Sequence, residues 1–154
     1  MPELTPVQLV ELRRRLVAAA VLPHQRAALP HVEKMSAVGP EAGSSAVTPH
    51  LLALIRKPGG NGLRGGIELA CAAVLGDTSP TGAVVAIGEA REDEVLQLAK
   101  AVVEQHLRGQ SHRGWALLQQ HQVPRRAAVL GFLASWLNLQ ITGISPDCGR
   151  SARA

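Results

Sequence analysis

Apolar residues recur at helical spacing along most of the chain, and capping residues mark the starts of several helices. Residues 5–8 (TPVQ) supply an N-cap threonine, a proline at the first helical position and a glutamine at the capping-box position. We therefore expect a helix over about 6–22 that ends at Pro23. A second helix is expected over about 25–37, interrupted or kinked at Pro30.

The middle of the chain predicts two helices joined by a glycine-rich loop. A Thr-Pro pair at residues 48–49 repeats the capping signal, so a helix is expected over 50–57. Residues 60–65 (GNGLRG) are expected to form the loop. The helix after it, over about 65–75, is apolar nearly all round and should lie at the centre of the core. Residues 39–45 predict a separate loop, rich in glycine, serine and proline.

The second half of the chain predicts three more helices. The clearest runs from Arg91 to Arg108, because acidic residues fill its first turn and Gly109 follows its last. The other two are expected over about 112–122 and 124–139.

Two stretches are less regular. Ser79 and Pro80 are a further candidate helix start, and the run GAVVAIG at residues 82–88 fits either a buried strand or a buried helical turn. A single strand would have nothing to pair with, so helix is favoured. Residues 145–154 are expected to form a flexible C-terminal tail.

These elements predict an all-α protein, a single compact bundle of six or seven helices. The chain has 154 residues, enough for one core, and its packing residues are mainly alanine, leucine and valine. Tyrosine is absent and there is one phenylalanine, which is unlike a β-sandwich. We expect a helical bundle domain over 1–144, within which 1–22 form an N-terminal helical extension.

Charge is unevenly distributed along the chain, although the net charge is only +4. Residues 1–65 hold eight Lys/Arg and four Asp/Glu, residues 66–105 hold two and seven, and residues 106–154 hold six and one. A basic–acidic–basic chain can stack with copies of itself or present a cationic face to a polyanion. An ordinary solvated surface explains the same charges equally well.

Cysteines and targeting signals indicate a reduced, cytoplasmic protein. Two cysteines do not make a disulfide framework; Cys71 is expected in the core and Cys148 in the tail. The chain lacks the order of a signal peptide, and no apolar run reaches transmembrane length, so no membrane partner is expected.

The loop at residues 60–65 formally matches G-x-G-x-x-G and lies among the cations Arg56, Lys57 and Arg64. Cations and free backbone N–H groups at a helix start suit a phosphate group. A dinucleotide site would need a strand before the loop, whereas the Thr-Pro pair predicts a helix. A phosphate-backbone contact and a plain helix–helix connection both stay open, and no cofactor is expected.

The sequence gives little support for a catalytic site or a metal site. The six histidines show no H-x-x-x-H spacing and no cysteine or carboxylate cluster joins them, so no metal site is expected. There is no G-x-S-x-G motif and no convincing Cys–His pair. We expect that the protein is not an enzyme and has no catalytic residues.

Arg125 and Arg126 open the last helix, where the helix dipole disfavours positive charge. An anionic partner would remove that penalty, which makes these arginines candidates for binding nucleic acid. The scarcity of aromatic residues indicates the mode of contact, since base stacking needs exposed rings. Contact should therefore be to phosphates and sugars, without sequence readout.

Three parts of the chain carry a resemblance to a known family. They are residues 25–28 (QRAA) with 32–34 (VEK); residues 49–55 (PHLLALI) followed by 61–63 (NGL) and 69–70 (LA); and residues 125–128 (RRAA) continuing to the Trp136-Leu137 pair. In this order they resemble the small helical subunit of the type III-B CRISPR Cmr effector complex. Residues 57–60 look like an insertion, and the first helix looks like an extension before the family's usual start.

The resemblance implies an all-α protein without catalytic activity, used in antiviral defence. Copies of such a subunit stack as a short filament inside a ribonucleoprotein effector and help to hold the guide RNA–target RNA duplex while other subunits cut it. The expected partners are guide RNA, target RNA, other effector subunits and copies of the chain.

We therefore expect a structural subunit that lines an RNA channel through phosphate contacts. The candidate RNA-binding residues are Arg26, Lys34, Arg56, Lys57, Arg64, Arg113, Arg125 and Arg126. One alternative is a helical protein–protein adaptor of a phage or secretion system without a nucleic-acid role. Another is a small enzyme with an anion-binding glycine loop.

Overall fold

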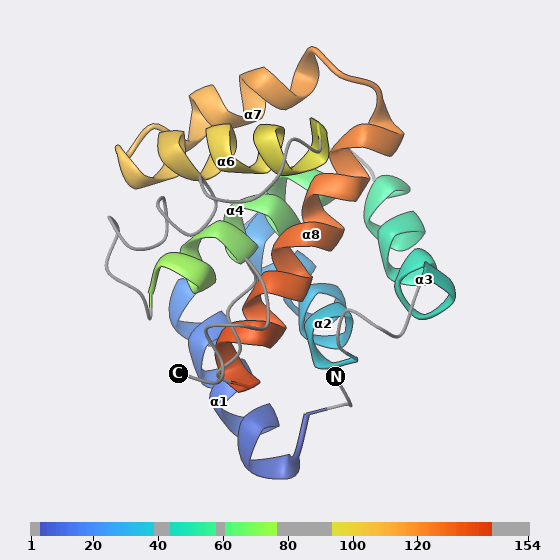
Figure 1. Cartoon of the computed structure of the whole chain (residues 1–154), viewed down its shortest axis with the longest axis vertical. Coiled ribbons are helices and arrows are strands. Elements are labelled where there is room, and N and C mark those ends of the chain that lie inside the picture. The colour runs from blue at the N-terminus through green and yellow to red at the C-terminus, as the bar shows by residue number, and fades with distance from the viewer. Residues whose placement is uncertain (1–3, 39–43, 58–60, 77–93, 143–154) are drawn as a thin grey trace.

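A computed structural model describes residues 4–38, 44–57, 61–76 and 94–142 (Figure 1). These ranges contain helices and no strands, and they confirm the predicted all-α bundle. The helices are α1 (Pro6–Ala19), α2 (Pro23–Ala37), α3 (Ser44–Ile55), α4 (Gly62–Leu75), α6 (Glu94–Leu107), α7 (Ser111–Gln119) and α8 (Val123–Thr142).

Helix α4 lies at the centre of the bundle, as the sequence predicts. It contacts α1, α2, α3, α6 and α8, and eleven of its fourteen residues are buried. Leu69, Ala70 and Val74 are completely buried. Figure 1 shows α6 and α7 packed together at one end of the molecule, while α8 crosses from that end to the region of α1 and α2. The helix that the sequence marks as apolar all round is therefore the one that its neighbours surround.

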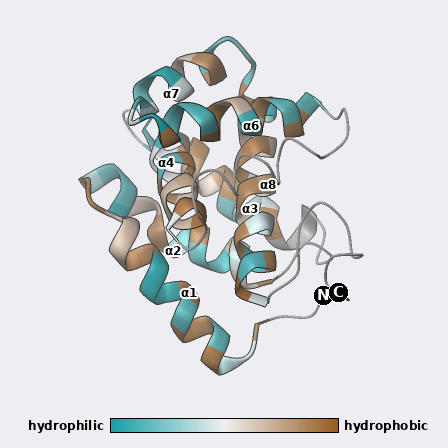
Figure 2. Ribbon diagram, turned by 60° about the vertical axis from the view of Figure 1, so that its left-hand side comes forward, coloured by the Kyte–Doolittle hydropathy of each residue, from teal (hydrophilic) through white to brown (hydrophobic). Residues whose placement is uncertain are grey.

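Helix α1 begins with the capping box that the sequence predicts. The Thr5 Oγ1 accepts from the Gln8 backbone N–H at 3.2 Å, and the Gln8 Oε1 accepts from the Thr5 N–H at 2.9 Å. The helix ends at Ala19 rather than at residue 22, because Leu22 precedes a proline and is extended (φ −94°, ψ 155°). Figure 2 shows hydrophobic and hydrophilic positions interspersed along α1.

The predicted start of α3 is wrong. The sequence predicts that Thr48 caps a helix, but α3 already begins at Ser44, so Pro49 lies inside it. Pro30 likewise lies inside α2. An internal proline removes one backbone hydrogen bond, and both helices accept this loss while they pack against each other and the core. The Thr-Pro pair therefore does not mark the start of this helix.

The end of α6 matches its prediction closely. Gly109 has φ 74°, its N–H donates to the His106 carbonyl at 3.0 Å, and the Gln110 N–H donates to the Gln105 carbonyl at 2.9 Å. This pair of bonds is a Schellman motif, for which glycine is the favoured residue. The predicted start of this helix at Arg91 lies outside the described residues.

Several predictions fall on residues that the structure does not describe. They are the helix start at residues 79–80, the ambiguous run at 82–88, most of the loop at 39–45, and the tail at 145–154 with Cys148. Among the described residues Cys71 is buried, as predicted. None of the described helices is both long and apolar enough to cross a membrane.

Candidate nucleic-acid interface

Residues 62–65 of the glycine-rich segment form the start of helix α4 rather than the expected loop. Gly62 and Gly65 both lie in the first turns of α4 and are buried. A Cβ added to Gly62 would overlap the carbonyl oxygen of Leu54, and one added to Gly65 would overlap that of His24. These glycines let the backbone of α4 touch α3 and α2.

The same close packing brings candidate residues from three elements to one end of the bundle. A Cβ on Gly66 would lie 3.0 Å from the Leu130 side chain of α8 and 3.3 Å from that of Leu54 in α3. The last turn of α3, the first turns of α4 and the N-terminal part of α8 therefore meet. We call the cations carried by these segments the cationic end; they are Arg56, Lys57, Arg64 and Arg125.

Carboxylates balance two of the four cations of the cationic end. The Arg64 Nε lies 2.9 Å from Glu68 Oε2, and the Arg125 Nη1 lies 2.7 Å from Glu94 Oε1. Glu94 is 76% exposed, and a surface pair of this kind contributes about 0–1 kcal/mol, so a phosphate can displace it. Within the described residues no carboxylate pairs with Arg56 or Lys57.

Arg126 has a structural role that the sequence argument missed. Its Nε lies 2.9 Å from the carbonyl oxygens of both Leu118 and His121, and its Nη2 lies 3.3 Å from that of Gln119. Its guanidinium also lies 5.7 Å from the centre of the Trp115 ring. The C-terminal carbonyls of α7 therefore supply the negative partner that the prediction assigned to RNA.

This difference between neighbouring arginines is testable by stability. We expect Arg126→Ala to lower the free energy of unfolding by about 2 kcal/mol, since it removes several charge-assisted hydrogen bonds. Arg125→Ala is the matched control and should cost less than about 1 kcal/mol, because it breaks one exposed pair. Urea unfolding of both variants measures the contrast. Equal losses of stability would show that the bonds from Arg126 to α7 do not stabilise the corner.

The remaining candidates lie on other segments of the chain. Lys34 lies in the last turn of α2 and is exposed. The Arg26 Nε donates to the Ala20 carbonyl at 3.3 Å, and Arg113 is exposed on α7. Four of the eight residues proposed from the sequence are carried by the segments of the cationic end, and Arg126 binds carbonyl groups at the α7–α8 corner.

Glu68 is a buried carboxylate that the sequence analysis did not single out. It accepts hydrogen bonds from His24 Nε2 at 2.8 Å, Gln25 Nε2 at 3.0 Å and Arg64 Nε at 2.9 Å. Burial alone would raise the pKa of Glu68, but the hydrogen bonds from Gln25, Arg64 and His24 outweigh burial and lower it. The sequence could have indicated this residue, because Glu68 is the one carboxylate in a helix that is otherwise mostly apolar.

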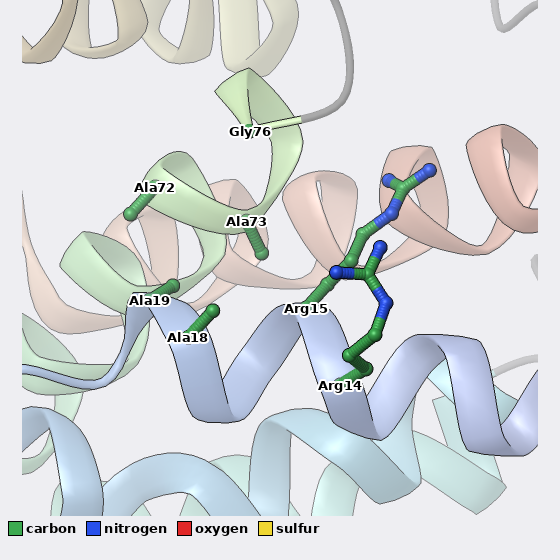
Figure 3. A pocket seen from close by; sticks show the side chains of 7 residues that line it. All are labelled: Arg14, Arg15, Ala18, Ala19, Ala72, Ala73 and Gly76. Carbon is green, nitrogen blue, oxygen red and sulfur yellow. The ribbon is translucent and has the colours of Figure 1, made fainter.

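A pocket of about 170 Å³ lies between α1 and the C-terminal end of α4 (Figure 3). Its lining consists of Arg14, Arg15, Ala18, Ala19, Ala72, Ala73 and Gly76. Both guanidinium groups reach the Glu11 carboxylate, at 2.6 Å from Arg14 Nη2 and 3.4 Å from Arg15 Nε, and hydrogen bonds from Arg14 hold the pKa of Glu11 at about 2. This carboxylate and the carbonyl end of α4 make the pocket a poor phosphate site.

Arg15 also links three helices through a buried polar chain. Its side chain is 7% exposed, and its Nη1 donates to Gln140 Oε1 at 2.9 Å. The Gln140 Nε2 in turn donates to the Val74 carbonyl at 3.1 Å, in the last turn of α4. Helices α1, α8 and α4 are therefore tied together at the end of the bundle opposite the start of α4.

Two further observations concern reactive groups among the residues that the structure describes. Burial raises the pKa of the Cys71 thiol to about 12, which makes it a poor nucleophile. The described residues include no group of three or more His, Cys, Asp or Glu side chains placed to hold a metal ion. Comparison of the chain with family models, curated proteins and solved structures finds no match. The resemblance to the small Cmr subunit stays a prediction.

Proposed function

We propose that the protein is a non-catalytic structural subunit of an RNA-guided ribonucleoprotein, of the type III-B CRISPR effector class, which holds RNA by its phosphates. The observation that supports this most is the cationic end, where three packed segments distant in sequence carry Arg56, Lys57, Arg64 and Arg125. Arg56 and Lys57 have no carboxylate partner in the described part of the chain, so a phosphate strand would supply their counter-charge.

The aromatic residues support contact with the backbone of RNA rather than its bases. Trp136 is 2% exposed, and Phe132 packs against the core. Trp115 is half-buried beneath the Arg126 guanidinium. Stacking platforms for single strands need exposed rings. The proposed partners are guide RNA, target RNA, other effector subunits and copies of the chain, in the cytoplasm.

The proposal predicts a location-specific decrease in RNA affinity. Arg56→Gln combined with Lys57→Gln should weaken binding and make the slope of log Kd against log salt shallower by about one for each phosphate that the variant no longer neutralises. Lys100→Gln in α6 combined with Arg108→Gln directly after that helix removes equal charge and is the control. Fluorescence anisotropy with an unstructured RNA at several salt concentrations measures both. Equal changes in the two double variants would contradict a specific role for the cationic end.

A protein–protein adaptor is the second candidate function, and one observation favours it. Val7, Val10 and Val17 on α1 are 79%, 70% and 58% exposed, and Val21 beyond the helix is 64% exposed. Apolar side chains gathered on one exposed element are typical of a surface that contacts another protein. If the protein does not bind RNA at low ionic strength, the adaptor function replaces RNA binding as the favoured candidate.

A further inference from the structure

A groove of about 340 Å³ lies between α1, α2 and α3. It is lined by Leu9, Arg13, Glu33, Lys34, Ala37, Val38 and His50. Apolar side chains form one part of this lining, and charged or titratable side chains form the other. Its volume lies within the range of small-ligand sites, although the lining is more charged than most of them.

The charge that the groove offers a ligand is positive. Its one carboxylate, Glu33, accepts hydrogen bonds from Arg13 Nε at 3.0 Å and Arg13 Nη2 at 2.9 Å, so these two charges offset each other. Lys34 has no ion pair within the described residues and is exposed. The groove therefore suits a ligand with one negative group and one flat or apolar group.

A pair of histidines adds a titratable charge to the groove. His50 Nδ1 lies 3.3 Å from His31 Nδ1, so one ring donates a hydrogen bond to the other and Nε2 of His50 is left for a ligand. The pKa of His31 is lowered by burial, by His50 and by Lys57. The charged and titratable groups facing this pair are Arg13 from α1, Glu33 and Lys34 from α2, and Lys57 after α3.

A neutral histidine pair can accept one proton without losing its hydrogen bond, because an imidazolium donates more strongly to the remaining neutral ring. An anion placed beside His50 and Lys34 would favour this protonated state. Histidine changes its charge between about pH 5 and pH 8, so the step falls in an accessible range.

We propose that this groove binds one nucleotide of an RNA chain, with the phosphodiester between Lys34 and His50 and the base against Leu9, Ala37 and Val38, and that the histidine pair takes up a proton on binding. The choice of RNA as the source of the nucleotide rests on the proposed function. Binding of a base here adds an apolar contact to the phosphate contacts of the cationic end.

Calorimetry with the full chain tests the proposal. The probe is the dinucleotide adenylyl-adenosine, whose single phosphodiester does not titrate near neutral pH; adenosine and dimethyl phosphate are the separate halves of the ligand. We expect the dinucleotide to bind more tightly than either half, and tighter at pH 6 than at pH 8 by up to tenfold per pH unit. Titrations in buffers of different ionisation enthalpy should show uptake of up to one proton.

Variants locate the effect within the groove. His50→Gln should abolish proton uptake, Lys34→Gln should weaken binding at every pH while uptake persists, and the exposed His112→Gln on α7 is the control. Thermal unfolding at pH 8 establishes that each variant is folded. Proton uptake that survives in His50→Gln, or a dinucleotide that binds no better than its halves, would overturn the proposal.

The same measurements separate this proposal from the proposed function. Longer RNA that binds while the dinucleotide does not would reject the groove and leave the RNA-binding function standing. A dinucleotide that binds with proton uptake, together with longer RNA that does not bind, would reject the structural RNA-binding role and retain the groove as a nucleotide site.

Discussion

Gly65→Ala should destabilise the protein by about 3 kcal/mol, although alanine is the better helix former. In an exposed helix this change stabilises by about 1 kcal/mol. Here the added methyl group would overlap the His24 carbonyl oxygen, which belongs to backbone and cannot rotate away. The overlap can be relieved only if α2 and α4 move apart, and this movement would also displace the core residues of α2. Overpacking of this kind costs about 1–3 kcal/mol and occasionally more.

Gly131→Ala is the matched control for this prediction. Gly131 also lies inside a helix, α8, but a Cβ there would meet no atom within 4 Å. We expect this variant to gain about 0.5–1 kcal/mol. Urea unfolding of both variants gives the comparison. If both substitutions stabilise the protein, the backbones of α2 and α4 are not in contact at His24.

Removal of the Glu68 carboxylate should be the second large effect, with a loss of about 3 kcal/mol for Glu68→Leu at pH 7. Glu68 is 6% exposed, and the change leaves the hydrogen-bond donors of His24, Gln25 and Arg64 without their acceptor. Breaking a buried ionic cluster by removing one member costs about 3–5 kcal/mol. The lower end applies because His24 and Arg64 remain partly exposed.

The pH dependence of this loss has a definite sign. The folded-state pKa of Glu68 is lowered from 4.5 by its hydrogen bonds, which outweigh burial. The stabilisation is therefore fully present above the unfolded-state pKa and disappears as pH falls through the folded-state pKa. The difference in unfolding free energy between wild type and Glu68→Gln should be largest near pH 7 and shrink below about pH 4.

The exposed Glu94→Gln is the control for the Glu68 variants, and its effect should stay below about 1 kcal/mol at every pH. A constant difference between wild type and Glu68→Gln down to pH 2 would show that folding does not shift the pKa of Glu68. Chemical denaturation at a series of pH values distinguishes these outcomes.

Features that depend on neighbouring residues were predictable from the sequence. The capping box at Thr5 and the glycine at residue 109 work through hydrogen bonds three to five residues apart, and both have the expected geometry. The apolar pattern of α4 also placed that helix correctly in the core. Such signals are short in range, and tertiary contacts do not need to be known to interpret them.

Features that depend on a distant partner were not predictable. Glycine serves both in loops and where two backbones touch, and nothing local to Gly65 names His24 as its neighbour. The partners of Arg126 are carbonyl groups at the end of the preceding helix. Their position depends on the angle between α7 and α8, which the sequence does not give. The cationic end likewise depends on Leu54, Gly66 and Leu130 packing together.

The polar chain from Arg15 through Gln140 to Val74 sets a limit on how far the protein can be shortened. A fragment that stops before residue 140 would remove the Gln140 acceptor from a guanidinium whose side chain is 7% exposed. Crystallisation trials and domain fusions should therefore trim no closer than Thr142, where α8 ends. Any tag or fused enzyme belongs beyond that residue, since a cut inside the last turn would loosen the first helix as well.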